Sequence, residues 1–105
     1  MSFRNKDYAM AQNIKAVFKR YTKDFLKFER IANPLNPRPD VCAFLMLQAL
    51  APDTSDIVSA AEHDRIWLDV DMDVLSAAAT EEQLRDLHRC GVLYDREYDC
   101  LSMMV

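Results

Sequence analysis

A single glycine, Gly91, is present among the 105 residues. β-sandwiches and barrels reverse their chains through frequent turns, in which glycine supplies backbone conformations that other residues avoid. A chain with one glycine is therefore expected to be mainly helical with a small antiparallel β element, an α+β fold. The length suits one domain, and a composition that is 50% hydrophobic and 29% charged is typical of a globular protein. We expect residues 1–105 to form a single domain.

Charge is strongly segregated along the chain. Residues 1–40 carry nine Lys and Arg and four acidic residues, whereas residues 41–105 carry four and thirteen. The net charge of −4 thus hides a basic amino-terminal part and an acidic remainder. Such asymmetry indicates charged partners, or pairing between the two parts within one molecule or between two copies.

The basic part predicts one amphipathic helix over residues 5–31. Its apolar residues recur every three or four positions, from Met10 to Phe28, and fall on one stripe. The cations of the opposite face are Lys15, Lys19, Arg20, Lys23, Lys27 and Arg30. Two interpretations stay open: these cations only solvate an outer face, or they form a surface for phosphates or an acidic partner.

A proline-rich linker is expected to separate this helix from the body. Three prolines in residues 33–39 are incompatible with a helix and favour an extended or turned chain. Asp40 is then placed to cap a helix over residues 41–50. That segment, VCAFLMLQAL, is apolar nearly all round, so we expect it at the buried centre of a body spanning residues 40–105.

The next elements are shorter. A helix ending at Ala61 is expected, capped at residues 54–55. From Ile66 onward apolar and polar residues alternate, which predicts a strand. The pattern leaves open where this strand ends, because Asp71 is equally suited to cap a helix over residues 72–79.

The clearest local signals surround one helix near the carboxyl end. Thr80 and Gln83 form the pattern of a capping box, and Gly91 is suited to the left-handed stop after a helix over residues 81–90. The segments GVLYD and CLSMMV, separated by the polar residues REYD, then predict a β-hairpin over residues 91–105.

This order of elements resembles the winged helix-turn-helix superfamily. The resemblance rests on IWLDV as the first strand, MDVLSAAA and TEEQLRDLHRCG as the helix pair, and VLYD with CLSMMV as the wing. It covers about the last forty residues and the central helix, and no motif singles out one family. It implies a domain that often binds DNA, with the second helix of the pair in the major groove and the wing on the backbone.

The surface that the resemblance assigns to DNA is net negative, which departs from that pattern. Phosphates repel such a face, so we expect it to bind a protein with a basic surface instead. The residues predicted to bind this partner are Glu81, Glu82, Arg85, Asp86, Arg89, Asp95 and Glu97.

Catalytic and metal-binding patterns are weak. Cys42, Cys90 and Cys100 include no CxxC pair, which favours free, buried thiols over a zinc site with His63 or His88. An aspartate cluster at residues 69, 71 and 73 lacks the glycine and glutamate of a calcium-binding loop and is better explained by capping and solubility. We expect no cofactor, no metal and no enzymatic activity.

The sequence therefore predicts a non-catalytic, cytoplasmic binding module without a membrane partner. Its first predicted role is that of an adaptor or inhibitor, such as a phage or mobile-element accessory protein, acting through the acidic helix and wing. The alternative is a DNA-binding regulator that uses the basic amino-terminal helix. A homodimer held by the segregated charges is a further alternative.

Overall fold

The computed structural model describes residues 12–52 and 56–104. It combines short helices with one antiparallel sheet, so the α+β class is confirmed. The helical elements are α2 (Ile14–Arg20), the 3₁₀ turns η1 (Thr22–Asp24) and η2 (Phe28–Arg30), α3 (Pro39–Leu50), α4 (Met72–Ala78) and α5 (Glu81–Arg89). The strands are β1 (Val58–Glu62), β2 (Arg65–Leu68), β3 (Val92–Asp95) and β4 (Cys100–Met104).

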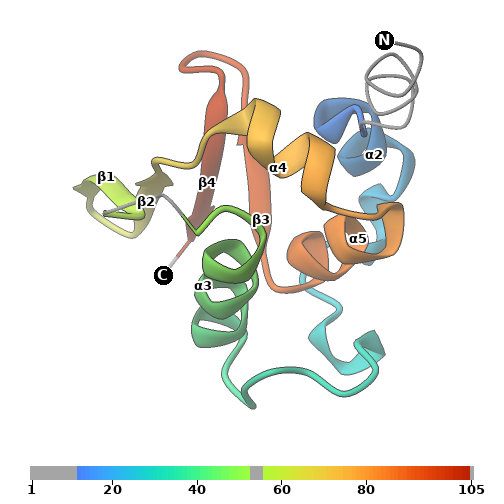
Figure 1. Cartoon of the computed structure of the whole chain (residues 1–105). Helices are drawn as coiled ribbons and strands as arrows, with labels where there is room; N and C mark the ends of the chain where they lie inside the picture. Colours follow the sequence, from blue (N-terminus) through green and yellow to red (C-terminus); the bar gives the residue numbers. More distant parts are fainter. Residues whose placement is uncertain (1–11, 53–55, 105) are drawn as a thin grey trace, which may run out of the picture.

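The sheet has four strands in the order β1-β2-β4-β3. It contains the expected hairpin, in which Val92 pairs with Met103, but it is larger than the small β element predicted. In the view of Figure 1, α4 passes in front of β3 and β4, α3 lies below these strands, and α2 and α5 stand together to one side. This arrangement is compatible with a winged-helix-like body.

The helix expected to end at Ala61 is instead strand β1, and this prediction is wrong. All five residues of β1 are exposed, so a helix there would have no apolar face to bury. His63 adopts a positive φ of 56°, which allows a tight reversal after which Ala61 pairs with Ile66 of β2. The proposed cap at residues 54–55 lies outside the described part of the chain.

The continuous basic helix over residues 5–31 is also contradicted where the structure describes it. The α-helix ends at Arg20, and the chain continues through η1 and η2 with Leu26 at a φ of 62°. The backbone of Leu26 donates to the carbonyl of His88 in α5 at 3.2 Å. Tertiary contacts with α5 thus override a pattern that local periodicity favours. Residues 5–11 lie outside the described range.

The linker and the central helix agree with the sequence except at their junction. Residues 32–38 are irregular, and α3 begins at Pro39, whose fixed φ suits the first helical turn. Asp40 was expected as the cap but lies inside that turn, and its carboxylate pairs with Arg38 at 3.0 Å. The proline moves the helix start upstream of the residue that sequence reasoning chose.

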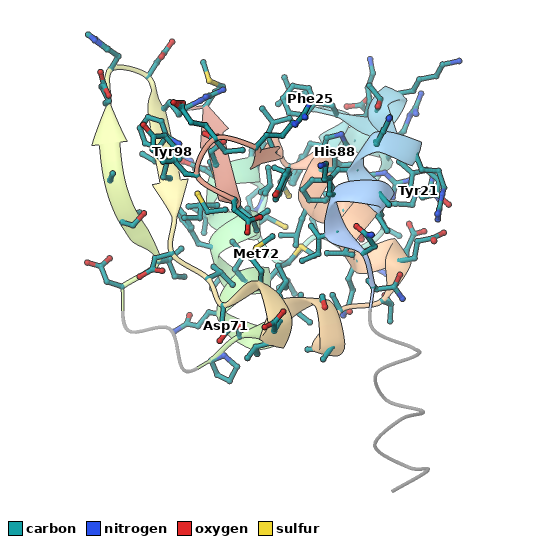
Figure 2. All side chains as sticks on the ribbon, turned by 90° about the horizontal axis from the view of Figure 1, so that it is seen from above. Tyr21, Phe25, Asp71, Met72, His88 and Tyr98 are labelled. Carbon is teal, nitrogen blue, oxygen red and sulfur yellow. The ribbon has the colours of Figure 1, made fainter. Side chains whose placement is uncertain are left out.

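The cap of α5 confirms the prediction made for it, and the cap of α4 decides between the alternatives left open at Asp71. Asp71 accepts hydrogen bonds from the backbone of Asp73 at 2.9 Å and of Val74 at 3.1 Å, which ends the alternating segment and starts α4. Thr80 and Gln83 form the reciprocal capping box. Figure 2 labels Asp71 at the beginning of α4.

The core lies between the helices and the sheet. It is built from α3, α4, α5, β2 and the hairpin, with α2 closing one side. Its fully buried side chains include Leu47, Leu68, Leu75, Leu84, Leu87, Val92, Leu101 and Met103. Cys42 and Cys90 are free and buried in this core, as the sequence predicted, whereas the free Cys100 is only partly buried.

Gly91 occupies a conformation that other residues resist, and its replacement tests the turn between α5 and β3. Its φ is +106°, and an added Cβ would lie 2.9 Å from the side chain of Leu26. Gly91→Ala is expected to lower the free energy of unfolding by about 1–2 kcal/mol, mainly through backbone strain. Urea denaturation measures the change, and an unaltered midpoint would contradict this assignment of strain.

Candidate functional site

The outer face of α5 is bound to the amino-terminal segment by a network of ion pairs. The Glu81 carboxylate accepts from Arg20 at 2.7 Å and from the Tyr21 hydroxyl at 2.5 Å. The hydrogen bond to Glu81 raises the pKa of Tyr21, so its hydroxyl keeps the proton it donates. The first residue of the predicted partner surface is therefore engaged within the molecule.

Asp24 is the centre of this network. Its side chain is only 6% exposed and accepts from Arg85 and Arg30 at 3.0 Å, while Arg89 lies 3.7 Å away. Burial acts to raise the pKa of Asp24, but the three guanidinium groups outweigh it and hold the pKa below its usual value. The charged carboxylate of Asp24 thus links η1 to α5 through ion pairs.

Arg89 connects this centre to the remaining acids of α5. Its side chain is 8% exposed and donates to Glu82 at 2.8 Å and to Asp86 at 2.7 Å. Burial raises the pKa of Asp86, although Arg89 opposes the change. All five predicted partner-binding residues on α5 consequently contribute to ion pairs inside one molecule, but among the described residues only the pair of Arg20 with Glu81 joins a cation of the basic part to an acid of the remainder.

The two predicted partner-binding residues after α5, Asp95 and Glu97, differ in how many contacts they make within the molecule. Asp95 accepts from the indole of Trp67 at 2.7 Å and from the backbone of Glu97 at 2.9 Å. The hydrogen bond from Trp67 is the largest cause of a lowered pKa at Asp95. Asp95 therefore organises the turn between β3 and β4, expected as the wing, whereas the side chain of Glu97 is exposed.

The predicted cations divide into two groups. Arg20 forms an ion pair with Glu81, and Arg30 forms one with Asp24. The other four are exposed and form no ion pair with any residue that the structure describes: Lys15, Lys19, Lys23 and Lys27. Exposed Arg96 of the wing turn likewise has no ion pair within residues 12–52 and 56–104.

Two of these lysines border a cavity of about 390 Å³, which we name the basic groove. Asn13 caps α2 through the backbone of Ala16 at 3.0 Å, and Lys15 and Lys19 follow one helical turn apart on the same face. The groove is lined by Lys15, Phe18, Lys19, Thr22, Phe25, His88, Leu93, Tyr94 and Arg96. It therefore joins α2, the turn after η1, α5 and the hairpin.

His88 forms the floor of the basic groove. It is 4% exposed, its ring stacks on Phe18 with centroids 4.7 Å apart, and Phe25 lies 5.2 Å away at a tilt of 47°. Figure 2 shows His88 and Phe25 close together beside α2. The sequence raised His88 as a zinc ligand of a weak pattern and did not connect it with Phe25.

The hydrogen bond made by His88 determines which of its two ring nitrogens is left without a partner among the described residues. Nδ1 lies 2.9 Å from the Val92 carbonyl, which only accepts, so Nδ1 carries the hydrogen and donates it. Burial lowers the pKa of His88. The ring is therefore neutral at pH 7, with Nε2 as an acceptor that has no hydrogen bond to a described residue.

Two other cavities differ from the basic groove in charge. One of about 430 Å³ has Trp67 and Tyr98 on its wall together with Asp69 and Asp99. Another of about 340 Å³ lies against α3 and includes Asp56. Neither is lined by a cation, whereas three cations and no carboxylate line the basic groove.

The described residues contain neither a metal-binding cluster nor a membrane-spanning helix. Within residues 12–52 and 56–104, no three His, Cys, Asp or Glu residues gather to hold a metal ion, so the aspartates at 69, 71 and 73 form no such cluster. No helix among the described residues has the length and apolar character needed to cross a membrane. Comparison with family models, curated proteins and solved structures found no match to this chain.

Proposed function

We propose that the chain is a non-catalytic module that binds nucleic acid through the basic groove. The observation that carries the proposal is the selective pairing of the amino-terminal cations. The fold neutralises Arg20 and Arg30 but leaves Lys15 and Lys19 exposed at a cavity. Unpaired cations around a concave surface attract phosphates, which supply most of the affinity in nucleic-acid binding.

Arg96 adds a third cation to the same groove. It comes from the wing turn, far from α2 in the sequence, and lines the groove with Lys15 and Lys19. Lys15 also lies over the Tyr94 ring, with Nζ 5.8 Å from its centroid. The groove thus combines cations with aromatic faces, the combination used by proteins that track a nucleic-acid backbone.

A protein-binding role for the acidic helix and wing remains a prediction with less support. A basic partner would have to displace the pairs that Glu81, Glu82 and Asp86 make with arginines of the same molecule. Such a partner exchanges existing ion pairs for new ones, so its net gain is smaller than at cations that have no pair. The basic groove requires no such displacement, which is why we place the function there.

Salt titration with a charge-matched pair of variants tests the proposal. We expect a fluorescein-labelled DNA oligonucleotide of about ten bases to bind roughly 20-fold more weakly when salt rises from about 50 to about 200 mM, as three phosphate contacts imply. Lys15→Gln with Lys19→Gln should lower the slope of log affinity against log salt by about 1.5. Fluorescence anisotropy measures both quantities.

The control is Lys23→Gln with Lys27→Gln. This variant changes the net charge equally, in the same segment, but neither lysine lines the groove. It should retain most of the slope and affinity. Equal losses in the two variants would show that overall charge is responsible, and absence of salt-dependent binding in the unaltered protein would refute nucleic-acid binding.

A further inference from the structure

We propose that the basic groove holds one unstacked base of a single-stranded nucleic acid against Phe25 and His88. The phosphates on either side of that base lie on Lys15, Lys19 and Arg96. This inference rests on the proposed function and narrows it, because it assigns the groove to single strands and excludes the intact duplex.

The walls of the groove have the shape and chemistry for an aromatic guest. Its volume of about 390 Å³ falls within the range of small-ligand pockets. Phe25 is half-buried, so part of its ring remains open, and Tyr94 of β3 is similarly placed on the same cavity. Bases in a duplex are stacked on one another, and only an unpaired base presents its face to such side chains.

The floor supplies a polar atom of the kind that reads a base edge. His88 is more than nine-tenths buried, and its Nδ1 is committed to the Val92 carbonyl. Nε2 is left as an acceptor on a ring that lines the groove, without a hydrogen bond to a described residue. Bases carry N–H donors on their Watson–Crick edges, so an inserted base satisfies this atom.

Charge complementarity sets the orientation of the guest. The cations come from the ends of long, exposed side chains, while the aromatic groups lie deeper, with Phe18 at 5% exposure. A nucleotide has the matching arrangement, since its phosphate is anionic and its base is flat and apolar on both faces. The phosphates therefore face solvent, and the base points toward His88.

The first test compares single and double strands on aromatic variants. Anisotropy titrations use the labelled oligonucleotide alone and annealed to its complement. We expect the single strand to bind at least about fivefold more tightly, and Phe25→Leu to weaken its binding by about fivefold or more, the loss of one stacked base. Phe28→Leu is the matched control, because Phe28 is also half-buried on a neighbouring turn but does not line the groove.

Photo-crosslinking gives a second measurement that needs no variant. An oligonucleotide containing 5-iodouracil is irradiated with the unaltered protein, and the modified peptides are identified by mass spectrometry. Crosslinks to Phe25 or Tyr94 support base insertion. Salt-dependent binding with equal affinity for duplex, no effect of Phe25→Leu and crosslinks elsewhere would overturn the inference while leaving the proposed function standing. Absence of binding to either probe would remove both.

Discussion

Replacing Asp24 with Asn is expected to destabilise the protein by about 3–5 kcal/mol. The substitution keeps the size of the side chain but removes the charge that Arg85 and Arg89 face in a buried setting. Breaking such a pair leaves a guanidinium without full compensation, which costs far more than losing an exposed ion pair. Urea denaturation at pH 7 measures the loss. Glu29→Gln, at an exposed neighbouring position, is the control and should change stability little.

The stabilisation of the folded state by Asp24 should also decrease as the pH falls. Because the three arginines hold its pKa below the usual 3.8, its stabilisation is complete above that value and is lost as pH falls through the folded-state pKa. The stability difference between the unaltered protein and Asp24→Asn should therefore narrow in acid. A difference that stays constant to the lowest pH measured would contradict the charged role of Asp24.

Leu47→Ala is expected to cost about 2–5 kcal/mol, because it opens a cavity at the centre of the fold. Leu47 is fully buried on α3 and belongs to the core shared with the sheet. Leu45→Ala on the same helix is a close control, since Leu45 is 38% exposed and should lose well under half as much. Similar losses at both positions would mean that α3 is oriented differently.

Local signals with a direct backbone cause were predictable from the sequence. The capping box at Thr80 and Gln83 satisfies amide groups within three residues, so its pattern specifies the structure locally, whereas the cap at Asp71 was one of two alternatives that the sequence left open. The hairpin after Gly91 follows for the same reason. Neighbouring residues contain all the information that these elements require.

The amino-terminal segment was not predictable in the same way. Its periodicity describes a long helix, but Asp24 is bound by arginines of α5 that lie far away in sequence. The energy of that buried cluster, and the contact of Leu26 with α5, decide where the helix stops. Such long-range terms override local propensity, and a single sequence does not reveal them.

The candidate site was predicted only in part. The sequence predicted the cations of α2 as a basic face. Charge segregation also suggested ion pairs within the molecule, and in the structure Arg20 forms such a pair whereas Lys15 and Lys19 line the groove. His88 and Phe25 had no spacing that joined them, since the reversal at Leu26 brings them together. The exposed cations could be listed from the sequence, but the groove they surround required the fold.

Mapping the contact surface by NMR tests the basic groove most directly. Unlabelled single-stranded oligonucleotide is added to ¹⁵N-labelled protein, and amide shifts are followed residue by residue. The largest shifts are expected at the residues lining the groove, among them Lys15, Phe25 and His88, while the amides of the distant strand β1 should stay unchanged. If the amide shifts were largest at the acidic residues on the outer face of α5 or along β1, with the groove unaffected, the result would contradict the site that we propose.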